Sequence, residues 1–284
     1  MRAAPLSPIA LPCRICGQST LRRFAAKGDR SGVLINVYFC AACNAHFTAP
    51  PEFDYEKEDE GLIAYYEAHR GYILWRHRRI FDYIERTFGL KRGSFLDIGS
   101  GAGYSLEVAA SRGWDAQGIE PGSRLAEYSR SRLGGLVIHG YFTSDLRAEL
   151  QVAKPSGYDY LLIDNVLEHV SDPVSFLDQA LGLLAERGVA LVAIPPVDWL
   201  RVMLGRSTLV RAFTHSAQIN LFYDPEQHVN YFSRRAMRYL VQEALGYELL
   251  PNNFHHSRML NSPLARFCNF ETGYFFIARS AGRG

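Results

Sequence analysis

The stretch Phe95-Leu96-Asp97-Ile98-Gly99-Ser100-Gly101-Ala102-Gly103-Tyr104 decides the fold of this chain. Its apolar start, residues 95–98, predicts a buried parallel strand. The three glycines predict a tight turn that lets the backbone approach a ligand closely, and residues 104–112 predict the helix that follows. A helix N-terminus placed after such a turn attracts a carboxylate or a phosphate. The stretch therefore indicates a binding site for a nucleotide-type cofactor.

The spacing of the glycines narrows the choice of cofactor. A dinucleotide-binding turn follows the pattern G-x-G-x-x-G, whereas this chain has G-x-G-x-G and an acidic residue, Asp97, near the end of the strand. This difference argues against NAD. A second apolar strand is predicted at residues 115–120, and it ends in Glu120, from which a carboxylate can bind a ribose diol. The interpretation left open is an ordinary glycine-rich turn followed by an acid by chance.

The D-x-G-x-G-x-G turn and Glu120 together resemble the class I S-adenosylmethionine (SAM) methyltransferases. Residues 158–173 strengthen the resemblance, because they are similar to the fourth strand and the following Leu-Glu-His-Val loop of that family. The resemblance covers roughly residues 60–280 and implies an α/β fold, with a Rossmann-like, seven-stranded, doubly wound sheet that binds SAM. The positions that match the family's cofactor site are Asp97, Gly99, Ser100, Gly101, Gly103, Glu120, Pro121 and Asn165.

Periodicity predicts further elements around this centre. Helical spacing favours a helix at residues 173–188, ended by Gly188, and another at 234–245, capped by Ser233. Asp145 is expected to cap the helix after the third strand, and Phe142 to lie against the adenine. Short apolar runs predict strands at 136–139, 189–194, 247–250 and 274–278.

Four of the five cysteines form two pairs, Cys13-x-x-Cys16 and Cys40-x-x-Cys43. This spacing is typical of a zinc ribbon, in which four thiolates complete a tetrahedron. A metal ion with four protein ligands has no open position, so we expect the Zn²⁺ to be structural. Two disulfides or a redox pair are the alternatives, which a reducing cytoplasm disfavours.

We expect three parts along the chain: a zinc-ribbon module at 1–52, a helical linker or lid over the cofactor at 53–92, and a SAM-binding domain at 93–284 with a lid insertion near 197–230. Aromatic residues with helical spacing predict one or two amphipathic helices in the linker. The order of ribbon, aromatic helix and SAM fold resembles the zinc-containing sugar C-methyltransferases and the ubiquinone-type small-molecule methyltransferases. The resemblance implies that a phenol of the pair Tyr65-Tyr66, in the linker, contacts the carboxylate of the cofactor or the substrate, and we assign Tyr66 to the cofactor. Packing in the core is the alternative for both residues.

Composition bounds the remaining possibilities. The chain has 284 residues, of which 48% are hydrophobic, enough for one domain of this fold and a small module. A net charge of +2 without a basic block predicts no nucleic-acid partner. No apolar run approaches the roughly 18 residues of a membrane-spanning helix, and prolines near the N-terminus disfavour a secretory signal. We therefore expect a cytoplasmic protein with no membrane partner.

Two histidines are candidates for catalysis. In-line transfer of a methyl group requires a correctly held acceptor, and a general base only where the acceptor carries a proton. Residues 225–233 are similar to the segment that enters the family's last helix, so His228 is the first candidate base. His169 is the second, although with Glu168 it could simply orient its loop by hydrogen bonds.

The residues together predict a SAM-dependent methyltransferase that acts on a small molecule in biosynthesis, such as a secondary metabolite, a sugar or a related precursor. One alternative is an enzyme that uses a modified SAM, or SAM for chemistry other than methyl transfer. The other is a scaffold whose zinc ribbon binds a partner, which the intact glycine turn and Glu120 disfavour. A carrier protein or a second copy of the chain could also bind through the ribbon.

Overall fold

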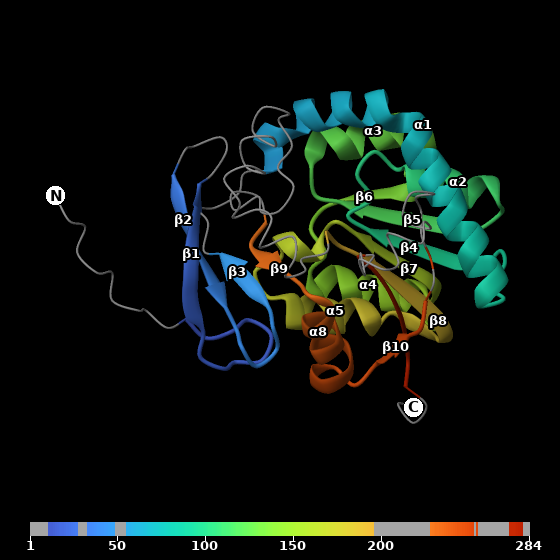
Figure 1. Ribbon diagram of the computed structural model, residues 1–284. Helices are drawn as coiled ribbons and strands as arrows, with labels where there is room; N and C mark the ends of the chain where they lie inside the picture. Colours follow the sequence, from blue (N-terminus) through green and yellow to red (C-terminus); the bar gives the residue numbers. More distant parts are fainter. Residues whose placement is uncertain are drawn as a thin grey trace, which may run out of the picture. The chain divides into compact units, whose positions relative to one another are not determined.

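The computed structural model describes residues 11–27, 33–48, 55–195, 228–252, 254 and 273–280 (Figure 1). These residues group into two compact units. The ribbon unit draws on Met1–Phe53, Glu168–Val174 and Pro195–Leu245, and the sheet unit on Asp54–Leu167, Ser175–Ile194 and Gly246–Gly284. The predicted boundaries near residues 52 and 92 stay predictions, and the predicted lid lies outside the described residues except for 228–230.

The sheet unit contains a seven-stranded sheet with the order β10-β11-β8-β7-β4-β5-β6. The five strands from β6 to β8 in this order are parallel, whereas β11 is antiparallel to both β8 and β10. This topology confirms the predicted doubly wound sheet. The strands are β4 (Ser94–Ile98), β5 (Asp115–Glu120), β6 (Val137–His139), β7 (Tyr158–Asp164), β8 (Leu184–Ala193), β10 (Glu248–Leu250) and β11 (Tyr274–Ala278).

Helices cover both faces of this sheet (Figure 1). One face carries α1, α2 and α3, and the other carries α4 and α5. The connections between parallel strands run through these helices, as a doubly wound fold requires. The helices are α1 (Tyr55–Thr87), α2 (Tyr104–Ser111), α3 (Ser123–Leu133), α4 (Ser144–Ala153) and α5 (Pro173–Leu181), with short 3₁₀ turns η1 (Gly134–Leu136) and η2 (Leu167–His169).

The aromatic linker is one continuous helix, α1, of 33 residues. Its buried face follows helical spacing and includes Ile73, Ile80 and Ile84. Phe81 on this face packs edge to face against Phe95 of β4, with ring centroids 5.2 Å apart. This apolar face packs α1 against the sheet. The linker was predicted to form one or two helices, and it forms one.

Two of the predicted local features are wrong. The helix that begins at Pro173 ends at Leu181, because the chain after Gly182 joins the sheet: Leu184 pairs with Tyr158. Apolar residues that continue the helical period therefore belong to the start of β8. Asp145 does not cap α4, since the side chain of Thr143 accepts from Leu146 N–H at 3.3 Å and is the N-cap.

The ribbon unit contains a four-stranded antiparallel sheet with the order β1-β2-β3-β9. The strand β9 comes from far along the chain, and it pairs with β3 through Phe47 opposite Asn230 and His46 opposite Tyr231. The predicted cap is confirmed, because Ser233 Oγ accepts from Ala236 N–H at 3.1 Å. The elements are β1 (Leu21–Lys27), β2 (Leu34–Phe39), β3 (His46–Thr48), β9 (Asn230–Tyr231), α8 (Arg234–Arg238) and the π-helical turn η3 (Tyr239–Ala244).

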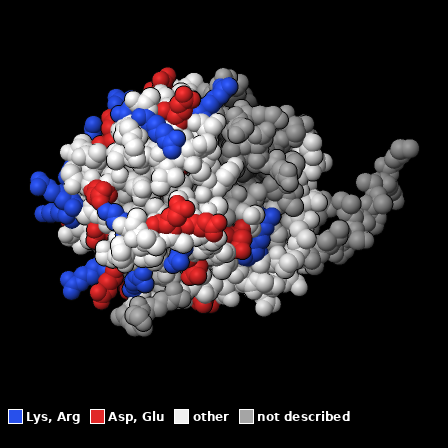
Figure 2. Space-filling model, turned by 180° about the vertical axis from the view of Figure 1, so that it is seen from behind, with Lys and Arg blue, Asp and Glu red and all other residues white. Residues whose placement is uncertain are grey.

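Acidic and basic side chains are interspersed on the face shown in Figure 2, without a broad region of one sign among the described residues. No helix in the described ranges combines the length and the hydropathy needed to cross a bilayer.

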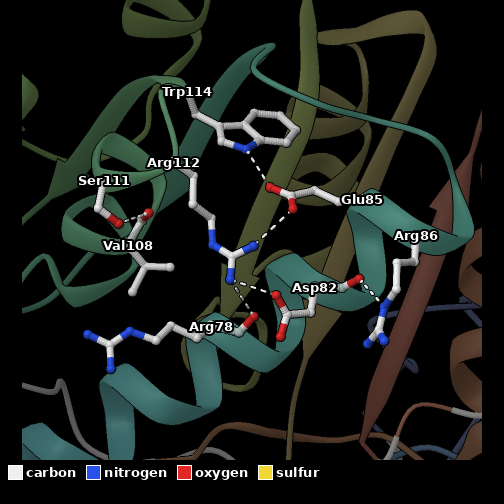
Figure 3. A network of polar contacts seen from close by, with 8 residues as sticks. All are labelled: Arg78, Asp82, Glu85, Arg86, Val108, Ser111, Arg112 and Trp114. Carbon is white, nitrogen blue, oxygen red and sulfur yellow. Dashed lines mark hydrogen bonds and ion pairs between the residues drawn. The ribbon is translucent and has the colours of Figure 1, made fainter.

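A network of charged side chains fastens α1 to the end of α2 (Figure 3). The guanidinium of Arg112 donates to the carboxylates of Asp82 at 2.7 Å and Glu85 at 2.9 Å, both on α1. The other oxygen of Glu85 accepts from the indole N–H of Trp114 at 3.2 Å. Arg112 and Glu85 are each only 22% exposed, so their ion pair is partly shielded from solvent.

We expect Arg112→Ala to lower the free energy of unfolding by about 1–2 kcal/mol, because a partly buried Glu85 loses its cation. Urea denaturation followed by circular dichroism measures the change. Arg86→Ala is the matched control, since Arg86 donates to the backbone oxygen of Asp82 within its own helix, at 2.9 Å. Its expected change is below about 0.5 kcal/mol. Equal losses in the two variants would show that the network contributes nothing.

Candidate functional site

Three acidic side chains meet at the carboxyl edge of the sheet. Asp97 lies near the end of β4, Glu120 ends β5 and Asp164 ends β7. These strands are neighbours and parallel, with Ile98 opposite both Ile119 and Ile163, so their ends coincide. Ligands bind at this edge in doubly wound folds.

The predicted glycine turn follows β4 at this edge. Gly99, Gly101 and Gly103 have φ angles of 84°, 53° and 74°, in the left-handed region that L side chains avoid. A Cβ on Gly99 would lie 2.3 Å from a methyl group of Val166, and one on Gly101 would lie 2.6 Å from the hydroxyl of Tyr66. The turn therefore requires glycine for its conformation and for its space.

Glu120 holds the turn from the neighbouring strand. One carboxylate oxygen accepts from Gly101 N–H at 2.7 Å, and the other from Gly122 N–H at 2.8 Å. The side chain is only 6% exposed. A carboxylate can accept several hydrogen bonds, including one from a hydroxyl of a ribose.

Asp97 is the most deeply buried of the three acids, at 3% exposed. The hydroxyl of Ser105 donates to its Oδ2, whereas Oδ1 has no hydrogen-bond partner among the described residues. Burial raises the pKa of Asp97 to about 8; Ser105 opposes this rise, and the negative charges of Asp164 and Glu120 add to it. An acceptor oxygen of this kind is suited to a cationic group of a ligand.

A guanidinium from α1 reaches the same edge. Arg76 forms an ion pair with Asp164, and the amide of Asn165 donates to Asp164 Oδ1 at 3.0 Å. Asn165 itself has a left-handed φ of 55°. Arg76 was not predicted as a site residue. Its position three residues after Ile73 places it beside the apolar face of α1, which is a signal that could have indicated its role.

Tyr66 lies over the glycine turn. A Cβ on Gly101 would be 2.6 Å from its hydroxyl oxygen, and its ring contacts Tyr104 edge to face, with centroids 6.1 Å apart. Burial, followed by the negative charge of Glu120, raises the pKa of the phenol. Its neighbour Tyr65 is 55% exposed and packs against His69, so Tyr66 is the member of the pair that faces the turn.

The residues at this edge fit SAM. The cofactor carries a sulfonium and an ammonium cation, and the edge offers three acidic side chains. One of them is Asp97, whose Oδ1 lacks a partner in the described part of the chain. The carboxylate of SAM requires hydrogen-bond donors. The buried hydroxyl of Ser100 and Nε of Arg76 can supply them, because neither has a partner among the described residues. Glycine keeps the turn open for close approach. Pro121 continues the chain directly after Glu120 at this edge.

The four predicted cysteines form one cluster in the ribbon unit. Their Sγ atoms all lie within 4.8 Å of one another, with Cys13 and Cys43 at 3.5 Å and Cys16 and Cys40 at 3.4 Å. A tetrahedral Zn²⁺ with Zn–S bonds of about 2.3 Å fits this arrangement. A hydrogen bond from Cys43 is the largest of the effects that lower the pKa of Cys13, to about 5, and it favours a thiolate there.

Local backbone supports both knuckles of the zinc ribbon. Gly17 and Asn44 follow the two cysteine pairs with left-handed φ angles of 70° and 63°. Their N–H groups donate to the carbonyl oxygens of Cys13 at 2.9 Å and Cys40 at 2.8 Å. The fifth cysteine, Cys268, lies outside the described residues.

The two candidate bases come together in the ribbon unit. The rings of His169 and His228 meet edge to face, with centroids 4.8 Å apart. Burial, followed by the nearby His169, lowers the pKa of His228 to about 3, so its imidazole is neutral at pH 7. His215, His255 and His256 lie outside the described residues.

The fold and the acid-lined glycine turn define a Rossmann-like methyltransferase. Comparison with known proteins agrees, because the family described as "Methyltransferase domain" (Methyltransf_23) matches residues 72–252. The chain belongs to this family of SAM-dependent methyltransferases, and its cofactor is SAM.

Individual proteins resemble the chain more distantly. The ubiquinone biosynthesis O-methyltransferase of Sodalis glossinidius (strain morsitans) is 26% identical over 182 residues, which are 61% of this chain and 72% of that protein. The plantazolicin methyltransferase BpumL, solved with a desmethyl-plantazolicin analogue and S-adenosylhomocysteine, has a TM-score of 0.51 and 16% identity over 78% of this chain and 90% of its own. A chain from the complex of the Haloferax volcanii Trm112 activator with a methyltransferase has a TM-score of 0.53 and 13% identity, over 81% and 100%. The two structures share the fold.

We expect Gly101→Ala to weaken SAM binding at least tenfold, because the added Cβ meets Tyr66 and strains a left-handed residue. Isothermal titration calorimetry measures the affinity. Gly135→Ala is the control, since no atom of the described chain lies within 4 Å of the new Cβ and φ is not left-handed. Unchanged affinity in Gly101→Ala would place the cofactor elsewhere.

The raised pKa of Asp97 predicts a pH dependence of cofactor binding. Below its pKa of about 8 the carboxyl is mostly protonated, and a cofactor with net positive charge binds the ionised form better. SAM affinity should therefore rise with pH between about 6 and about 7.5, approaching tenfold per unit. Titrations across this range measure the slope. Asp97→Asn should bind more weakly and with a flatter profile, and equal slopes in both proteins would remove Asp97 as the titrating group.

Proposed function

We propose that this methyltransferase transfers the methyl group of SAM to a small-molecule acceptor in a biosynthetic pathway. Two comparisons support an acceptor of this size. The Sodalis relative is named for ubiquinone biosynthesis, and BpumL was solved with a monoazolic desmethyl-plantazolicin analogue. The single observation that carries the reaction class is the buried acidic edge around the glycine turn, formed by Asp97 and Glu120.

Each residue at the sheet edge has a proposed part in holding the cofactor. SAM supplies an activated methyl group when it is bound. Glu120 fixes Gly101 and accepts from the ribose, while Asp97 accepts from the cationic amino-acid end. The side chain of Tyr66 covers the glycine turn at Gly101 and reduces the access of water to it. Holding the reactants in line in this way supplies most of the rate enhancement of a displacement reaction.

The test is methyl transfer itself. Purified protein with quantified zinc is titrated with SAM and S-adenosylhomocysteine, and then incubated with SAM and a panel of hydroxyl, amine and activated-carbon acceptors. We expect micromolar binding that Glu120→Ala abolishes, followed by acceptor-dependent formation of S-adenosylhomocysteine. Absence of binding to the wild-type protein would contradict the proposal. The alternatives, a modified cofactor and a partner-binding ribbon, then gain support.

We further propose that a protonated acceptor is activated at His228, with His169 as the second candidate. The two rings lie together on backbone that is fixed by hydrogen bonds, since Thr48 Oγ1 donates to the carbonyl oxygen of His228 at 3.0 Å. A neutral imidazole can accept a proton, and the lowered pKa of His228 makes it a weaker base than a free imidazole. Neighbouring Glu168 is buried beside this pair.

We expect His228→Ala to lower turnover at least tenfold while SAM affinity stays within about twofold, because general-base assistance contributes roughly 10²–10⁴. Steady-state kinetics and calorimetry on the same preparation separate the two effects. His139→Ala serves as a control for the loss of an imidazole, because His139 lies exposed at the end of β6. Wild-type turnover in His228→Ala would exclude His228 from the mechanism.

A further inference from the structure

A carboxylate lies with the two histidines of the ribbon unit. One donor atom from each of Glu168, His169 and His228 lies within 4.8 Å of the others. Glu168 is only 2% exposed, and the histidines are half-buried. A buried carboxylate can orient an imidazole base, and one carboxylate with two imidazoles is also a donor set typical of metal sites.

The backbone that carries these three side chains is held from two sides. Val229 N–H donates to the carbonyl oxygen of Glu168 at 2.9 Å, and the amide of Asn230 donates to that of Val170 at 2.6 Å. These bonds join the Glu168–His169 segment to the His228 segment. The donor atoms are therefore brought together by a fixed backbone, which reduces the ordering cost of binding an ion.

Residues of the zinc ribbon brace the His228 segment from its other side. The guanidinium of Arg14, between Cys13 and Cys16, donates to the carbonyl oxygens of Val229 at 3.0 Å and Thr48 at 2.9 Å. Thr48 N–H also donates to the Val229 oxygen, at 3.0 Å. The first knuckle of the ribbon thus supports the backbone next to His228.

We propose that Glu168, His169 and His228 form a second metal site, which binds a divalent first-row transition-metal ion. Two imidazoles and one carboxylate are a ligand set for Zn²⁺ or Fe²⁺, and three protein ligands leave at least one coordination position open. Mg²⁺ and Ca²⁺ fit less well, because they prefer oxygen ligands throughout. The donor atoms lie within 4.8 Å of one another, which is close enough for small side-chain adjustments to place an ion about 2.1 Å from each of them.

The metal site has a consequence for acceptor activation, which rests on the proposed function although the site itself does not. A bound ion uses the nitrogen lone pairs that a free imidazole base needs. An acceptor hydroxyl bound at the open position would release its proton to solvent water more readily, because a divalent cation lowers the pKa of a bound oxygen acid. The histidines then act on the acceptor through the ion.

Metal content tests the site directly. The full-length chain is equilibrated with Zn²⁺, freed of loosely held ions and analysed by atomic emission. We expect two zinc ions per chain. A mercurial thiol reagent releases only the ion held by the cysteines, and the other ion leaves on addition of a strong chelator. A single ion that the mercurial releases completely would overturn the proposal.

Variants assign the second ion to its ligands. Glu168→Gln, His169→Ala and His228→Ala should each lose the chelator-sensitive ion and keep the thiolate-bound one, which reports that the ribbon is still folded. His139→Ala, outside the cluster and exposed, should keep both ions. Wild-type metal content in both histidine variants of the cluster would also overturn the site. Because this readout needs no turnover, failure of the proposed methyl transfer leaves it unaffected.

Discussion

Parallel pairing of β5, β4 and β7 is the constraint on which the sheet unit depends. Strands that end together bring Asp97, Glu120 and Asp164 to one edge, where like charges repel and burial penalises ionisation. The fold offsets each acid differently. Glu120 accepts from two backbone N–H groups, Asp164 pairs with Arg76, and Asp97 stays largely protonated at neutral pH with one bond from Ser105. A positively charged cofactor completes this arrangement, because it favours the ionised form of Asp97, which the protein alone disfavours by burial.

The ribbon unit solves a different problem with a metal. Its four-stranded sheet is small, so a bound Zn²⁺ adds folding free energy to that of the apolar core around Val37 and Phe47. The same unit extends through Arg14 and Thr48 to the backbone of His228. A structural ion and the candidate catalytic histidines therefore share one framework, and the position of the imidazoles depends on the integrity of the cysteine cluster.

Local structure can be predicted from this sequence where local chemistry dictates it. The glycine turn, β5 and the cap at Ser233 follow from residues that permit few alternatives. Prediction failed after Leu181, because an apolar period continued past the helix into β8, and only pairing with β7 decides between the two. Arg76 and β9 were not predicted as functional parts, since an ion pair 88 residues apart and a two-residue strand leave little local signal. The untested site residues, His228 and His169 among them, stay predictions.

The position of β9 late in the chain also delays the completion of the ribbon sheet during synthesis. Thr48 bonds to His228, 180 residues later, and β3 has its partner on that side only when β9 has left the ribosome. At about 5–20 residues per second, this delay is roughly 10–40 s. Throughout that interval β3 is an unpaired edge of the ribbon sheet. An unpaired edge favours association between nascent chains. Early capture of zinc would shorten the exposure of the rest of the ribbon, but not of this edge.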